Sequence, residues 1–100
     1  MVNEIRVSPE AEAELDEIWL FVARSSGSID IANRVTDGIT ARFGLLSRYP
    51  AAGRIREDLG PEIRTFVADA YLIVYSLGDA NVVTVLHIAG AGRDVFPLVQ

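Results

Sequence analysis

The chain has 100 residues, half of them apolar, with a formal net charge of −5 at pH 7 and no cysteine. This length allows one domain, residues 1–100, with one modest core, and the apolar fraction argues against disorder. The lack of cysteine excludes disulfides and thiolate metal sites. No stretch reaches the roughly 18 apolar residues of a membrane span, and the start lacks a signal peptide. We therefore expect a cytoplasmic protein without membrane contact.

Two helices follow a short strand predicted at residues 4–7. Ser8 and Pro9 suit the N-cap and first turn of the first helix, and residues 25–27 end it. Ser28 is a natural cap for the second helix, at about residues 29–48, which Pro50 terminates. Each helix carries one apolar stripe at helical spacing: Ala11, Leu15, Ile18 and Val22, then Ala32, Val35, Ile39, Phe43 and Leu46. A short connection predicts an antiparallel hairpin.

After Pro50, the composition of the sequence changes from one that favours helices to one that favours strands. Residues 63–67, 71–77 and 82–89 are rich in β-branched and aromatic side chains, and Asp69 and residues 78–81 supply turns. Three strands in an antiparallel meander behind a helical hairpin make an α+β domain, with the helices on one face of the sheet.

Trp19, Leu20 and Phe21 extend the apolar surface of the first helix beyond its stripe. At about 100° per residue, Leu20 points away from the stripe, which favours a partner covering the outer face. The alternative is a single exposed leucine, which is common. We take these three residues as candidates for partner binding.

Arginines supply the candidates for a second surface. Arg54, Arg56 and Arg64 lie at the start of the predicted sheet, and Arg93 lies at its far end. In an antiparallel meander, Arg64 and Arg93 are expected to approach the same face of the sheet. The alternative is ordinary surface pairing with acidic neighbours, which contributes little. The acidic net charge disfavours nucleic-acid binding, so direct DNA binding is not expected.

His87 and two tyrosines complete the candidate list. His87 lies in an apolar strand, and is either a histidine covered by a neighbour or a proton donor on the sheet. Tyr71 and Tyr75 share a strand face, either as core-edge residues or as ligand contacts. With a single histidine and no nucleotide-binding loop, we expect no metal and no other cofactor.

The order and spacing of these residues resemble the ParE/RelE family of small toxins from type II toxin–antitoxin modules, over about residues 7–95. The resemblance rests on Pro50-x-x-Gly53-Arg54-x-Arg56-x-x-Leu59, Arg64-x-Phe66, Tyr71-x-Ile73-x-Tyr75 and the Arg93-Asp94 pair. It favours the ParE branch and implies a strand, a two-helix hairpin and a three-stranded meander. It also implies a growth-inhibiting toxin in a hetero-oligomer with a ParD-like antitoxin, a ribbon-helix-helix protein with a disordered tail.

The resemblance leaves three activities open: inhibition of DNA gyrase by direct binding, ribosome-dependent cleavage of messenger RNA as in the RelE branch, or antitoxin binding alone. Many family members end the last strand with His-Gly-basic-Arg-Asp, whereas this chain has Gly90-Ala-Gly92-Arg93-Asp94. Because His87 falls about three residues early and lysine is absent, we favour the gyrase inhibitor over an enzyme. The target-binding candidates are Arg54, Arg56, Arg64, Tyr75 and Arg93, and the catalytic candidates, if the chain is a ribonuclease, are Arg64, His87 and Arg93.

Overall fold

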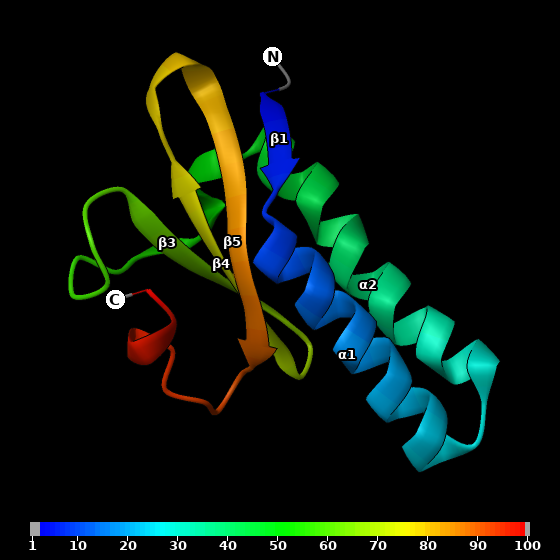
Figure 1. Cartoon of the computed structure of the whole chain (residues 1–100). Coiled ribbons are helices and arrows are strands. Elements are labelled where there is room, and N and C mark those ends of the chain that lie inside the picture. The colour runs from blue at the N-terminus through cyan, green and yellow to red at the C-terminus, as the bar shows by residue number, and fades with distance from the viewer. Residues whose placement is uncertain (1–2, 100) are drawn as a thin grey trace.

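A five-stranded sheet with a helical hairpin on one face makes up the fold (Figure 1). The computed structural model describes residues 3–99. The elements are β1 (Glu4–Val7), α1 (Pro9–Ser26), α2 (Ile29–Arg48), β2 (Arg54–Ile55), β3 (Ile63–Ala68), β4 (Tyr71–Leu77) and β5 (Val82–Gly90). Single 3-10 turns lie at Pro50–Ala52, Asp79–Asn81 and Phe96–Leu98. The predicted α+β architecture is confirmed, and the short strand β2 is an addition to it.

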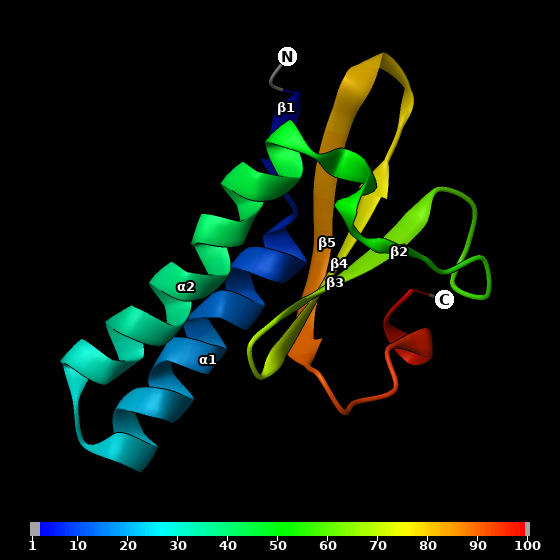
Figure 2. The same ribbon diagram turned by 180° about the vertical axis from the view of Figure 1, so that it is seen from behind.

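The helices begin and end where the sequence signals place them. Ser8 Oγ accepts a hydrogen bond from Ala11 N at 3.0 Å, and Ser28 Oγ accepts one from Ile31 N at 3.2 Å. Gly27 follows α1 with a φ of 68°, a left-handed conformation that glycine adopts without steric cost. The hairpin is antiparallel, as expected, and Figure 2 shows it from the α2 side.

The strand order is β1-β5-β4-β3-β2. β2, β3, β4 and β5 pair in antiparallel fashion, whereas β1 pairs with β5 in parallel, with Val7 opposite Val85. A bulge interrupts the β4–β5 register between Val74 and Tyr75. The sequence analysis did not assign the pairing of β1, which depends on a contact between residues far apart in the chain.

Both faces of the sheet are covered. The hairpin packs on one face around a core that includes Ile39, Leu46, Ile73, Tyr75 and Val85. The other face carries a smaller cluster, formed under the 56–62 loop and the C-terminal segment, of Leu59, Leu72, Val74, Ala89 and Val95. Within residues 3–99, neither helix is long and apolar enough to cross a membrane.

Candidate functional site

A groove of about 290 Å³ lies between the middle of α1 and the end of β5. Its lining comprises Glu14, Glu17, Ile18, Phe21, Tyr71, Ile88, Ala89, Gly90 and Arg93. Phe21 is 66% exposed, which is unusual for a phenylalanine and leaves its ring available to a partner. The groove therefore brings together Phe21 and Arg93, which the sequence analysis had assigned to two different surfaces.

Trp19 and Leu20 do not line this groove. Trp19 Nε1 donates to Asn33 Oδ1 at 2.8 Å, so the indole ties α1 to α2 within the hairpin. Leu20 is 42% exposed, as its position off the apolar stripe predicts. Of the three candidates on α1, Leu20 and Phe21 offer apolar surface, whereas the polar end of Trp19 already has a partner inside the protein.

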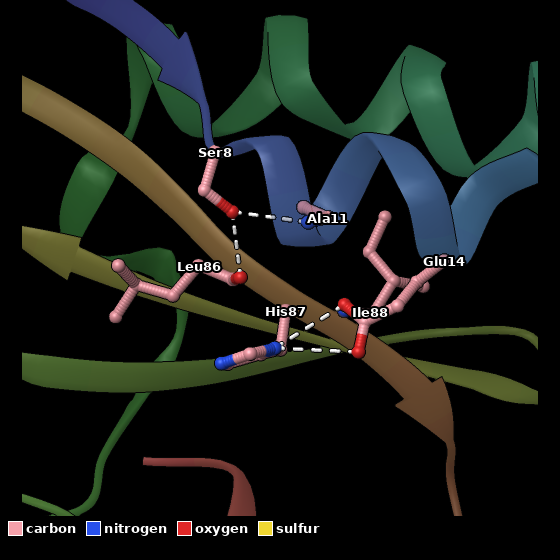
Figure 3. Close-up of polar contacts among 6 residues, drawn as sticks. All are labelled: Ser8, Ala11, Glu14, Leu86, His87 and Ile88. Atoms are coloured by element: carbon pink, nitrogen blue, oxygen red, sulfur yellow. Dashed lines mark hydrogen bonds and ion pairs between the residues drawn. The ribbon is translucent and has the colours of Figure 1, made fainter.

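His87 is held by a carboxylate from α1 (Figure 3). Its Nδ1 lies 3.3 Å from each carboxylate oxygen of Glu14, and Glu14 Oε1 also accepts from Ile88 N at 2.9 Å. The other end of the imidazole points away from Glu14, and His87 borders a second hollow of about 310 Å³ with Glu10 and Leu98. His87 is thus a covered strand histidine, oriented by one carboxylate.

Tyr75 is fully buried and both hydrogen-bonding functions of its hydroxyl are used. The hydroxyl donates to Pro50 O at 2.7 Å and accepts from Gly53 N at 2.8 Å. Burial raises the pKa of Tyr75, while the Gly53 N–H and the charge of Arg64 act in the opposite direction. Its assignment as a target contact was wrong, because a side chain with 0% exposure offers no surface to a target.

Arg64 lies opposite Tyr75 in the β3–β4 ladder and, like Tyr75, hydrogen-bonds the turn after α2. Its Nη1 donates to Gly53 O at 3.0 Å and to Ala51 O at 3.5 Å, so one nitrogen of the guanidinium group is engaged with main-chain carbonyls of the turn. Gly53 permits this arrangement, since a Cβ there would overlap the Tyr75 hydroxyl. Pro50, Gly53, Arg64 and Tyr75 together lock the turn after α2 onto the sheet.

The remaining arginines are dispersed. Arg56 forms a bidentate pair with Asp58 at 2.9 and 2.8 Å, and this hydrogen bonding holds the pKa of Asp58 below its usual range. Arg54 is exposed on β2. Arg64 and Arg93 do not meet, because Arg64 is level with Tyr75 whereas the end of β5 is level with Tyr71, at about 3.3 Å per residue along β4. Arg64 and Arg93 therefore do not form one cluster, and their joint role in target binding stays a prediction.

Comparisons with known proteins agree with this fold and with the motif. The model of the family described as ParE toxin of type II toxin-antitoxin system, parDE, matches residues 5–95. This chain belongs to that family. It is 32% identical over 83 residues to Toxin ParE3 of Caulobacter vibrioides, which covers 83% of this chain and 81% of that protein.

Solved structures extend the likeness of fold across the ParE and RelE branches. A chain of the chromosomal ParDE system from P. aeruginosa superposes with a TM-score of 0.76 at 18% identity, covering 89% of this chain and 96% of that chain. A chain of the RelBE2 toxin–antitoxin complex from Mycobacterium tuberculosis gives 0.63 at 20% identity, covering 90% and 99%. A double mutant of E. coli RelE in the free state gives 0.70 at 15% identity, covering 99% and 94%.

Glu14 is a site residue of this ParE-family chain that the sequence analysis missed. The sequence analysis assigned no role to the acidic residues of α1, Glu14 among them. Glu14 lies three residues after Ala11 and four before Ile18, both on the apolar stripe. This spacing places it on the face that meets the sheet, and a carboxylate there needs a polar partner.

Proposed function

We propose that this protein is the toxin of a type II toxin–antitoxin pair and that it inhibits DNA gyrase by direct protein contact. In the cytoplasm it is held inactive in a hetero-oligomer with a ParD-like antitoxin, whose disordered tail covers exposed apolar surface on α1. The observation that carries the proposal is membership of the ParE family, together with 32% identity to Toxin ParE3.

The chemistry of the described residues supports a binding toxin rather than an enzyme. A metal-free ribonuclease needs a base, an acid and stabilisation of charge around one phosphate. Here Arg64 is engaged with main-chain carbonyls and Tyr75 is buried. His87 and Arg93 border different hollows, so the catalytic candidates are not gathered around one position.

The antitoxin surface we propose begins at Leu20 and Phe21. These neighbouring side chains are 42% and 66% exposed, and a disordered tail that folds on binding can cover a large area. Replacing both with Asp should weaken antitoxin binding by several kcal/mol if they are anchors. Titration calorimetry measures this, and unchanged affinity would contradict the assignment.

Ribosome-dependent cleavage of messenger RNA is the second candidate function, favoured by one observation. Glu14 orients the imidazole of His87, and a carboxylate in contact with a histidine is a common arrangement in acid–base catalysis. Glu10 borders the same hollow as His87, and its negative charge opposes the approach of a phosphate group.

The deciding experiment is induced expression without the antitoxin in the native host. Gyrase inhibition predicts arrested growth with a DNA-damage response and intact transcripts. Primer extension would reveal ribonuclease activity as discrete cuts positioned by codon, and loss of those cuts in His87→Ala would promote the second candidate. Normal growth despite full antitoxin binding would instead identify a chain that only binds its antitoxin.

A further inference from the structure

The outer edge of β5 is paired in three successive ways. β1 pairs with it as far as Val85. Where β1 ends, Ser8 continues, with its N–H donating to Val85 O at 2.9 Å and its Oγ donating to Leu86 O at 2.8 Å. Glu14 then accepts from Ile88 N at 2.9 Å (Figure 3). Ser8 and Glu14 thus supply hydrogen bonds along the part of this edge that β1 is too short to cover.

This replacement stops inside the groove. Ala91 N donates to Ala70 O of the β4 side at 2.9 Å, and alternate residues of an antiparallel strand direct their main-chain groups to opposite edges. The N–H of Gly90 and the carbonyl of Ile88 therefore point away from β4. Both groups thus lie outside the β4–β5 ladder, neither makes a turn, loop or cap hydrogen bond among residues 3–99, and Ile88 and Gly90 both line the groove.

The two free groups have the spacing that a parallel strand requires. In a parallel pair, one residue donates to the carbonyl of residue i−1 and accepts from the N–H of residue i+1. With Ala89 as residue i, these groups are Ile88 O and Gly90 N. An antiparallel neighbour would need Ile88 N, which Glu14 holds, or Gly90 O, which already accepts from Arg93 N at 3.0 Å.

We propose that an extended segment of the antitoxin pairs in parallel with the end of β5, with one of its residues opposite Ala89. The segment would continue the line and direction of β1. This inference rests on the antitoxin partner of the proposed function and specifies how that partner is recognised: through main-chain pairing of an extended chain, in addition to apolar contact with α1.

The lining of the groove defines the side chains of the segment. Residues on either side of the one opposite Ala89 fall level with Ile88 and Gly90, on the sheet face that α1 covers. There they meet Ile18, Phe21 and Tyr71, so they are apolar. Arg93 lies beyond the end of β5, and an acidic side chain following the apolar ones complements its charge.

Two substitutions at Gly90 distinguish the loss of the main-chain N–H from the effect of adding side-chain atoms at this position. Gly90→Pro removes the free N–H, which the fold itself does not use, at an edge position where proline is tolerated. Gly90→Ala is the matched control, because it keeps the N–H and an added Cβ meets nothing within 4 Å. The probe is the purified product of the adjacent antitoxin gene, titrated by calorimetry. We expect Gly90→Ala to bind within threefold of the wild-type chain and Gly90→Pro to bind at least tenfold more weakly.

Amide hydrogen exchange of the wild-type complex tests the inference even if Gly90→Pro fails to fold. The Gly90 amide should exchange rapidly in the free chain and at least tenfold more slowly in the complex, while the Ala89 amide, directed at β4, is protected in both. Equal affinity of the two variants, or an unprotected Gly90 amide in the complex, would overturn the inference and leave the proposed function standing. A wild-type chain that does not bind the antitoxin would overturn both.

Discussion

Removing the hydroxyl of Tyr75 should destabilise the protein without altering any exposed surface. Together with Arg64, this hydroxyl ties the turn after α2 to the sheet, through Pro50 O at 2.7 Å and Gly53 N at 2.8 Å. In Tyr75→Phe the ring still fills the core, but the Gly53 N–H is left buried without a partner.

The expected loss follows from the two hydrogen bonds. An unsatisfied buried donor or acceptor costs about 1–3 kcal/mol, and the Pro50 carbonyl is less deeply buried than the Gly53 N–H. We therefore expect Tyr75→Phe to lower the free energy of unfolding by about 2–3 kcal/mol. For a domain of this size, that lowers the melting temperature by roughly 10–20 °C.

Urea and thermal unfolding, followed by circular dichroism, measure this loss. Tyr71→Phe is the matched control, since it removes the same atom from the same strand face and its hydroxyl makes no hydrogen bond within residues 3–99. It should change stability by less than about 0.5 kcal/mol. Equal stability of the two variants would refute the assignment of Tyr75 to the fold, and so would lost toxicity at unchanged stability.

Four further outcomes are expected. Gly53→Ala should destabilise the chain by at least about 1–3 kcal/mol in urea unfolding, because the new Cβ would stand 2.6 Å from Cε1 and 2.8 Å from Cζ of Tyr75. The raised pKa of Tyr75 means that its contribution is fully present below about pH 10 and is lost as pH rises through the folded-state pKa; an alkaline fall in melting temperature that persists in Tyr75→Phe would contradict this. Glu14→Ala should lower the free energy of unfolding by about 1–3 kcal/mol by orphaning Ile88 N, whereas Glu14→Gln, which keeps an acceptor, should lose less. Arg93→Ala should relieve growth inhibition with little change in melting temperature, and full toxicity would exclude Arg93 from target binding.

The elements that sequence reasoning placed correctly are those with local signals. Ser8, Gly27 and Ser28 specify helix ends within a few residues of themselves, and runs of β-branched and aromatic residues mark β3, β4 and β5. The two-residue strand β2 and the parallel pairing of β1 had no such signal. Both exist because distant segments meet, β1 with β5 and β2 with β3, and single-sequence patterns carry no information on those partners.

The sequence predicted the candidate site correctly for a side chain that faces water. It was misleading for side chains that hydrogen-bond inside the fold. Helical spacing correctly gave the exposure of Leu20. Arg64 and Tyr75 were read as a surface because they are polar and belong to the family motif, but a polar group in a motif can equally satisfy a buried turn. The hydrogen bonds that decide between these readings join residues 11 to 25 positions apart.

The distinction between exposed residues and residues that hold the fold together indicates where the residues responsible for toxicity should be sought. Pro50, Gly53, Arg64 and Tyr75 gave the resemblance much of its specificity, and all four take part in one structural lock. A lock of this kind identifies the fold shared by toxins with different targets and does not identify the target. Arg93 and the groove beside it lie outside the lock, at the opposite end of β4. Substitutions that spare stability and change toxicity should therefore cluster near Arg93, and substitutions in the lock should reduce both together.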